Sequence, residues 1–210
     1  MRQYDPARPP ASPGRGDGFV LYLEGAADRA IVKGWCKRLL PALASRLARS
    51  VVILGGRQPA RAVEHFRSLG GAEAGQRGLC VLDRDDGLAS EPDGDTPGLE
   101  FFTWGRRHIE SYLLVPAAIR RGLGLPDTDG RVDRLLREHI PLRGDDEAWR
   151  NLDAKRLLGR SGPLARSFGG PVPLARVARA TRESELHEDV HACFSELRSA
   201  LGVVEAIVVR

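Results

Sequence analysis

The sequence predicts an α/β fold: a mostly parallel sheet flanked by helices, with a helical elaboration in the second half. Continuous apolar runs of strand length recur in the first half, and helical patterns separate the first three of them. Such alternation is typical of a parallel sheet covered by helices on both faces. The second half shows mainly helical patterns, interrupted by glycine and proline. We expect a flexible arm or linker over residues 1–18, an α/β core over 19–125 and the helical elaboration over 126–210.

Four strands and two helices are expected in the first half. The strands are the apolar runs 19–23, 50–54, 79–82 and 99–104. The first helix begins near Ala27, and its apolar side chains recur every four residues: Ile31, Trp35, Leu39, Leu43 and Leu47. The second helix runs from Pro59 to Leu69, with the proline in its first turn, where the missing N–H does no harm.

The second half is expected to be helical over four segments: 108–123, 131–140, 146–158 and 185–201. Glycine and proline interrupt the helical pattern at 124–130 and at 159–173. The closing apolar segment, 203–209, fits either a last strand or a continued helix.

Composition excludes several classes of protein. A chain of 210 residues that is 42% hydrophobic and 29% charged can bury a core of its own. It contains neither an apolar run long enough to cross a bilayer nor an apolar signal core near its start, so we expect a cytoplasmic protein. Three widely spaced cysteines (Cys36, Cys80 and Cys193) fit a reducing compartment. The net charge of +4 weakly favours a polyanionic partner.

Lysine is rare in this chain. Three of the 32 basic residues are lysine (Lys33, Lys37 and Lys155), and the remaining 29 are arginine. Where arginine supplies almost every positive charge, a lysine marks a candidate site that needs a compact ammonium instead of a planar guanidinium. Biased base composition of the gene is the alternative explanation, and the count alone does not decide between the two.

An acidic group follows the first expected strand. Glu24 ends the strand, Gly25 allows a sharp turn, and Asp28 lies in the first turn of the helix. Ligands of open parallel sheets bind outside the carboxyl ends of the strands, so we expect both carboxylates to face that crevice. A carboxylate at the end of a buried strand is costly unless it binds something, which favours a function for Glu24. Asp28 fits equally well an acid stabilised by the helix dipole.

A second acidic group, Asp83-Arg84-Asp85-Asp86, follows the third expected strand. In extended backbone, Asp83 and Asp85 project to the same side, and two such carboxylates repel each other unless a cation lies between them. Mg²⁺ and Mn²⁺ are the natural cations for such oxygen ligands. An acidic surface turn is the plainer alternative. A phosphatase loop of the form Asp-x-Asp-x-Thr is disfavoured because the threonine is missing.

Both acidic groups are expected at the same edge of the sheet, because each follows a strand. Together they supply enough carboxylates for two metal ions. Two ions about 3.5–4 Å apart can hold the attacking and leaving oxygens of a phosphoryl displacement. Neither motif is specific alone, but the pair favours a metal-dependent reaction at a phosphodiester.

These segments resemble those of a known family. Residues 21–35 (LYLEGAADRAIVKGW) and 79–87 (LCVLDRDDG) resemble the Toprim domain, the metal-binding fold of topoisomerases, bacterial primases and certain nucleases. Residues 104–114 (WGRRHIESYLL) and 151–158 (NLDAKRLL) resemble two later segments of the Toprim domains of overcoming-lysogenisation-defect (OLD) family nucleases. The resemblance covers residues 19–200. It departs at Ser111, where the family has asparagine, and at Ala154, where it has glycine before the lysine.

The resemblance implies a Toprim-type sheet and a nuclease that cleaves DNA with two divalent cations, Mg²⁺ or Mn²⁺. It implies five metal ligands, some acting through water: Glu24, Asp28, Asp83, Asp85 and Glu110. It also implies that Lys155 reaches the metal site and offsets charge in the transition state, so that Lys155, Glu24 and Asp83 are catalytic. Read from the residues alone, Glu110 could instead be a buried partner of Arg107, Lys155 a solvated lysine, and His108 a structural residue or a phosphate contact.

The resemblance also implies partners. Family members carry an ATPase domain before the Toprim domain or work with an ATPase partner, and they tend to dimerise through the ATPase part. This chain has no Gly-x-x-x-x-Gly-Lys phosphate loop. We therefore expect the carboxyl-terminal region of an ATPase–Toprim protein, with the ATPase supplied in cis or in trans; a free-standing effector is the alternative.

Several arginines could lie along a nucleic-acid backbone, although arginines on helices are more often simply solvated. They are Arg106, Arg107, Arg120, Arg121 and Arg160. DNA is the expected substrate, and RNA stays open. The alternative function is a regulatory module that binds metal and nucleic acid without cutting. A topoisomerase would need a tyrosine free for attack, and a primase would need a basic nucleotide-binding domain; the sequence suggests neither.

Overall fold

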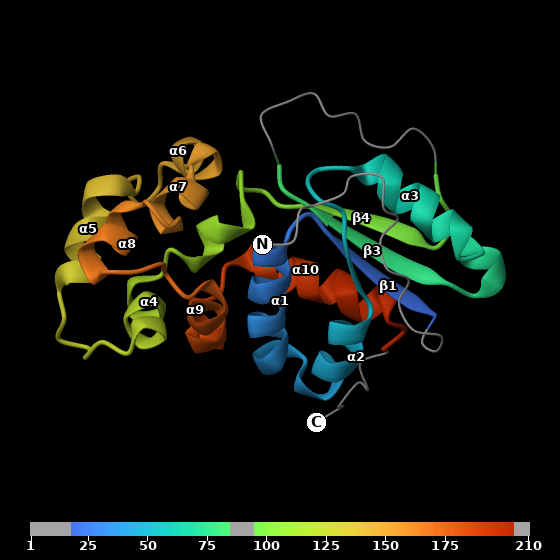
Figure 1. Ribbon diagram of the computed structural model, residues 1–210, viewed down its shortest axis with the longest axis horizontal. Helices are drawn as coiled ribbons and strands as arrows, with labels where there is room; N and C mark the ends of the chain where they lie inside the picture. The colour runs from blue at the N-terminus through green and yellow to red at the C-terminus, as the bar shows by residue number, and fades with distance from the viewer. Residues whose placement is uncertain (1–17, 85–94, 204–210) are drawn as a thin grey trace.

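The computed structural model describes residues 18–84 and 95–203, whose arrangement Figure 1 shows. Three parts of the sequence interpretation lie outside the described residues: the arm up to residue 17, the end of the acidic run with Asp85 and Asp86, and the closing segment from residue 204.

Four strands in the described part of the chain form one parallel sheet, in the order β2-β1-β3-β4. They are β1 (Phe19–Leu23), β2 (Val51–Ile53), β3 (Arg77–Leu82) and β4 (Leu99–Thr103). Leu23 of β1 pairs with Ile53 of β2 and with Val81 of β3, so these three strands reach the same carboxyl edge. The predicted α/β class with a parallel sheet is confirmed.

Helices cover both faces of the sheet (Figure 1). α1 (Ala26–Leu39) and α10 (Glu188–Ala200) lie on one face, and α3 (Pro59–Ser68) lies on the other. Side chains along β1 alternate between the two layers, as a strand requires: Leu21 and Leu23 join the larger core cluster, while Tyr22 joins the smaller one with Phe66 of α3. Both faces of the sheet are therefore buried.

The first helix is shorter than its apolar pattern predicts. α1 ends at Leu39, and Pro41 opens a 3-10 turn, η1 (Pro41–Leu43), before a separate helix, α2 (Ala44–Arg49). Proline lacks the backbone N–H that a helix interior needs and clashes with the preceding turn. The expectation of one helix through Leu47 was therefore wrong, although Leu47 is buried.

The helical half is more finely divided than expected. Its helical segments in the described residues are η3 (Ile109–Leu113), α4 (Pro116–Leu123), α5 (Arg131–His139), α6 (Asp146–Asn151), α7 (Ala154–Leu158), α8 (Pro163–Phe168), α9 (Leu174–Ala180) and η4 (Glu183–Glu185). The expected helices 108–123 and 146–158 are each two elements, because Pro116 opens α4 and the Asp153 side chain caps α7. α8 and α9 were not expected. A further 3-10 turn, η2 (Gly71–Ala74), precedes β3.

The two halves are joined by close helix packing. α1 packs directly on α9, and a Cβ atom built at Gly34 would lie 2.7 Å from the Ala178 Cβ, so only glycine fits there without displacement. α10 returns from the end of the chain to pack against β3 and β4. Among the described residues, no helix combines the length and apolar character that a bilayer crossing requires.

Candidate metal centre at the carboxyl edge of the sheet

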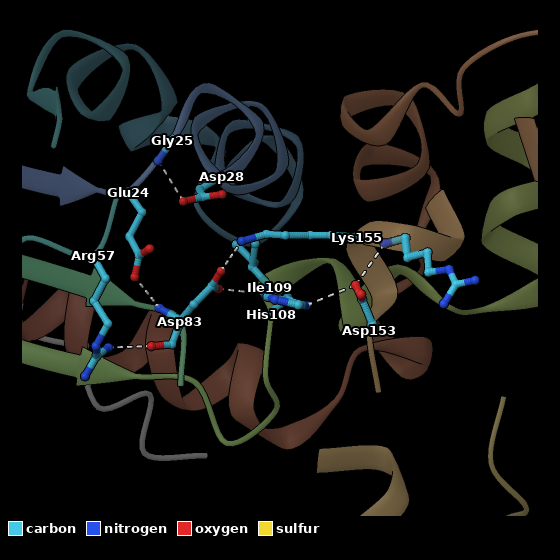
Figure 2. Close-up of polar contacts among 10 residues, drawn as sticks. Glu24, Gly25, Asp28, Arg57, Asp83, His108, Ile109, Asp153 and Lys155 are labelled. Atoms are coloured by element: carbon cyan, nitrogen blue, oxygen red, sulfur yellow. Dashed lines mark hydrogen bonds and ion pairs between the residues drawn. The ribbon is translucent and has the colours of Figure 1, made fainter. Parts of the chain in front are cut away.

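The structure brings Glu24 and Asp83 into direct contact at the carboxyl edge of the sheet (Figure 2). Glu24 follows β1, Asp83 follows β3, and the Asp83 backbone N–H donates to Glu24 Oε1 over 2.7 Å. Both side chains are buried, Asp83 with 2% of its surface exposed and Glu24 with 8%. Neighbouring parallel strands thus place two acids side by side, as their positions in the sequence predict.

Asp28 lies at the same edge and has a local structural role as well. Its Oδ2 accepts the Gly25 backbone N–H over 2.9 Å, so the N3 residue satisfies the N-cap N–H at the start of α1. Burial, together with the negative charge of Asp83, raises the pKa of Asp28 above its usual range. Asp28 is therefore both a helix cap and part of an acidic cluster whose members oppose each other's ionisation.

Asp83 is the residue to which the other site groups connect. Its Oδ1 accepts the Ile109 backbone N–H over 2.9 Å, from the segment that follows β4. Its Oδ2 accepts Lys155 Nζ over 2.6 Å, from α7. One buried carboxylate therefore ties together the end of β3, the segment after β4 and the helical half of the chain.

Lys155 reaches the site from the helical half, as the resemblance implies. Its side chain is 45% exposed, although its amine pairs with the buried Asp83. Partial burial opposes its charge, but the hydrogen bond and charge of Asp83, with the charges of Glu110 and Asp28, raise the pKa of Lys155. Ala154, where the family has glycine, is the first residue of α7 and is buried, so this backbone requires no glycine.

Glu110 is buried in η3, after β4, and is 4% exposed. Burial and the charges of Asp83 and Asp28 raise the pKa of Glu110 to about 7, against the opposing charge of Lys155. Its Oε2 and the Oγ of the neighbouring Ser111 are both buried without a hydrogen-bond partner among the described residues. Buried polar groups normally have partners, so these two oxygens are available to a ligand.

His108 stands beside this cluster. Its Nδ1 lies 3.9 Å from Asp153 Oδ1, the carboxylate that caps α7. Burial and the charge of Lys155 lower the pKa of His108, so the ring is neutral near pH 7. This placement makes His108 a neighbour of the site, between the sheet and α7 (Figure 2).

Arg57 is a site residue that the sequence interpretation missed. It follows β2, and its Nη1 donates to the backbone carbonyl of Asp83. Gly55 and Gly56 precede it, both with positive φ, and both backbone N–H groups donate to the Glu24 carbonyl over 3.0 Å. The Gly-Gly pair directly after an expected strand was the available signal, because it indicates a sharp turn at the same sheet edge.

The arginines expected to contact nucleic acid have different surroundings. Arg106 lies over the rings of Tyr112 and Trp149, with its guanidinium carbon 5.1 Å and 4.6 Å from their centres, and is half-buried. Arg107 is half-buried, and its backbone N–H donates to the Arg150 carbonyl over 2.8 Å. Arg160 is exposed. Of the other two, Arg120 pairs with Asp133 and Arg121 with Glu185.

A tighter group of ligand-type side chains lies elsewhere. Within residues 18–84 and 95–203, the group whose ligand atoms all lie within 4.8 Å of one another is His187, Glu188 and Asp189. This group could hold an ion, but Asp189 already accepts the Tyr112 hydroxyl. Among the described residues, no three of the predicted metal-binding carboxylates bring their oxygens as close together as this.

The carboxyl edge of the sheet nevertheless fits a divalent cation. Its described members are oxygen ligands, which Mg²⁺ and Mn²⁺ prefer. Glu110 offers an unpartnered buried oxygen. Burial and neighbouring acids raise the pKa values of Asp28 and Glu110, and a bound cation would offset both effects. Four of the five predicted ligands thus lie at this edge of the sheet, although no three of their ligand atoms lie within 4.8 Å of one another. The fifth, Asp85, lies outside the described residues.

No family model matches the chain, and no curated protein matches it. Among solved structures, the chain is similar to the C-terminal region of the OLD protein of Xanthomonas campestris pv. campestris, at 18% identity and a TM-score of 0.49. The match covers 89% of this chain and 97% of that chain.

Proposed function

We propose that this chain is a divalent-metal-dependent nuclease domain that cleaves the phosphodiester bonds of DNA. The observation that carries the proposal is a buried cluster of four acids from three segments (Glu24, Asp28, Asp83 and Glu110) with one lysine amine on Asp83. Burying several like charges together is costly unless they bind a cation. A metal-binding site beside a positively charged amine suits a polyanionic substrate.

The roles of the residues follow from their contacts. Divalent cations bound there supply activation of water and neutralisation of phosphate charge. Asp83 and Glu24 hold such cations at the strand ends, with Asp28 and Glu110 completing the ligand set. Lys155, whose amine is charged and partly exposed, faces the substrate phosphate and offsets the charge that develops as the bond breaks.

The proposal is tested by incubating the purified chain with supercoiled plasmid DNA and Mn²⁺ or Mg²⁺. We expect nicked or linear DNA, and none in EDTA. Asp83→Asn keeps the size of the side chain but removes its charge. It should lower the cleavage rate by more than about 100-fold, since even residues behind metal ligands are typically worth 10–100-fold.

The matched control is Glu64→Gln, which removes a carboxylate from an exposed position on α3. It should cleave at the wild-type rate, and thermal unfolding of both variants verifies that they are folded. Wild-type cleavage by folded Asp83→Asn would place the chemistry elsewhere. Calorimetric Mn²⁺ binding without any cleavage would instead favour the regulatory module that binds metal and nucleic acid without cutting.

A further inference from the structure

The loop after β2 folds back over the end of β1. Gly55 and Gly56 adopt φ values of 85° and 126°, which side chains with a Cβ rarely adopt. Their backbone N–H groups donate to the Glu24 carbonyl, each over 3.0 Å. Arg57 follows directly, so this turn delivers its guanidinium to the same edge as Glu24 and Asp83 (Figure 2).

The guanidinium of Arg57 is committed to the backbone of the central acid. Its Nη1 donates to the Asp83 carbonyl, while Glu24 Oε1 accepts the Asp83 N–H. The Arg57 side chain is half-buried, and its Nε is fully buried without a hydrogen-bond partner in the described part of the chain. Both backbone polar groups of Asp83 are thus held by neighbouring loops, at the residue where β3 has just ended.

The buried Cys80 lies near both Arg57 and Glu24. Burial raises the pKa of the Cys80 thiol to about 12; the charge of Glu24 adds to this rise, and the charge of Arg57 opposes it. Cys80 lies in β3, fully buried beneath the site. Cys80 therefore lies within electrostatic range of both the Glu24 carboxylate and the Arg57 guanidinium.

We propose that Arg57 is a positioning residue for the metal ligands, a role that rests on the proposed nuclease function. By fixing the Asp83 carbonyl, Arg57 fixes the direction in which the chain leaves β3 and presents the Asp83 carboxylate. Groups that orient ligands from behind typically contribute 10–100-fold to metal affinity. The alternative, a direct phosphate contact, is less favoured because Nη1 is already engaged and Nε is buried.

Mn²⁺ binding, measured by isothermal titration calorimetry without DNA, tests this role. Arg57→Gln should weaken Mn²⁺ binding by roughly 10-fold or more. Arg57→Lys can still donate one hydrogen bond to the carbonyl and should bind within a few-fold of wild type. The matched control is Arg61→Gln: Arg61 also donates to a backbone carbonyl, but to that of Leu54 after β2, over 2.8 Å, instead of that of Asp83. It should bind Mn²⁺ as wild type does.

The outcomes separate this inference from the proposed function. If wild type itself binds no Mn²⁺, the proposed function fails. If wild type binds and folded Arg57→Gln binds equally well, the positioning role is wrong. Equal Mn²⁺ binding with a raised KM for DNA would replace the role with a phosphate contact. If Arg57→Gln does not fold, Arg57→Lys is the deciding variant. Mn²⁺ binding by Arg57→Lys that is weakened by about 10-fold, with Arg61→Gln unchanged, would contradict a positioning role that one hydrogen bond can fulfil.

Discussion

The site is built from two regions that differ in how firmly they hold their residues. At the sheet edge, Asp83 is 2% exposed and hydrogen-bonded through its N–H, its carbonyl and both carboxylate oxygens. In the helical half, Lys155 is 45% exposed and comes from α7, a helix of five residues. The ends of parallel strands position Glu24 and Asp83, whereas a short helix and a long flexible side chain position the Lys155 amine.

This difference suggests a division of labour between the two regions. Acids fixed by backbone hydrogen bonds are pre-organised to bind metal, because little rearrangement is required of them. The lysine amine, which now occupies Asp83 Oδ2, can move aside on its flexible stem when a metal ion or phosphate enters. Metal binding should therefore depend on the sheet region, and the rate of cleavage on both.

The largest expected effect concerns Lys155. Lys155→Met should lower the rate of DNA cleavage about 100- to 1,000-fold, since it removes a charge aimed at the reacting phosphate. It should leave Mn²⁺ binding intact or strengthen it, because the amine that competes for Asp83 is gone. Cleavage assays and calorimetry measure the two quantities. The matched control, Lys37→Met, removes an exposed lysine at the end of α1 and should change neither. Loss of Mn²⁺ binding in folded Lys155→Met would contradict the claim that metal binding depends on the sheet region alone.

A second prediction concerns pH and Glu110 in the metal-free protein. Because burial and neighbouring acids raise the pKa of Glu110 to about 7 from 4.5, the folded state holds a proton there that the unfolded state releases. Stability from this group is therefore complete below pH 4.5 and lost as pH rises through 7, by about 3 kcal/mol in total.

Denaturant unfolding in EDTA at a series of pH values measures this loss. Glu110→Gln should flatten the decline between pH 4.5 and 7, since the amide does not titrate. Glu64→Gln, the exposed control, should keep the wild-type slope. An unchanged slope in Glu110→Gln would mean that the sheet-edge region does not hold Glu110 as a buried acid.

The smallest effect tests the joint between the two regions. Gly34→Ala places a methyl group 2.7 Å from Ala178 Cβ and 2.9 Å from the Ala175 carbonyl oxygen of α9. Overpacking should lower the free energy of unfolding by about 1–2 kcal/mol, whereas the same change in a free helix would raise it by about 1 kcal/mol. Gly130→Ala, which meets no atom within 4 Å, should change it by no more than about 0.5 kcal/mol. A stabilised Gly34→Ala would contradict the close α1–α9 packing.

The sheet was predictable from the sequence because runs such as Phe19–Leu23 are apolar at every position, as strands buried on both faces must be. Helix ends were less predictable: the spacing of Leu39, Leu43 and Leu47 continues through Pro41, and the proline decides the break. α9 escaped notice because it packs through small residues opposite Gly34, a signal that exists only in three dimensions.

The candidate site divides in the same way. Glu24 and Asp83 follow strands directly, so the topology of a parallel sheet suffices to bring them together. Glu110 was suggested by the family resemblance, and Lys155 by the rarity of lysine together with the resemblance. Nothing in their spacing predicts that α7 folds onto the end of β3. Arg57 was missed because its contact depends on the turn at Gly55 and Gly56.

The central claim is that the acids at the carboxyl edge of the sheet bind divalent cations. Anomalous diffraction from crystals soaked in Mn²⁺ tests it most directly. We predict an anomalous peak within coordination distance, about 2.0–2.6 Å, of Asp83 and of at least one of Glu24, Asp28 and Glu110. Full Mn²⁺ occupancy at His187, Glu188 and Asp189, with no peak beside Asp83, would contradict the account.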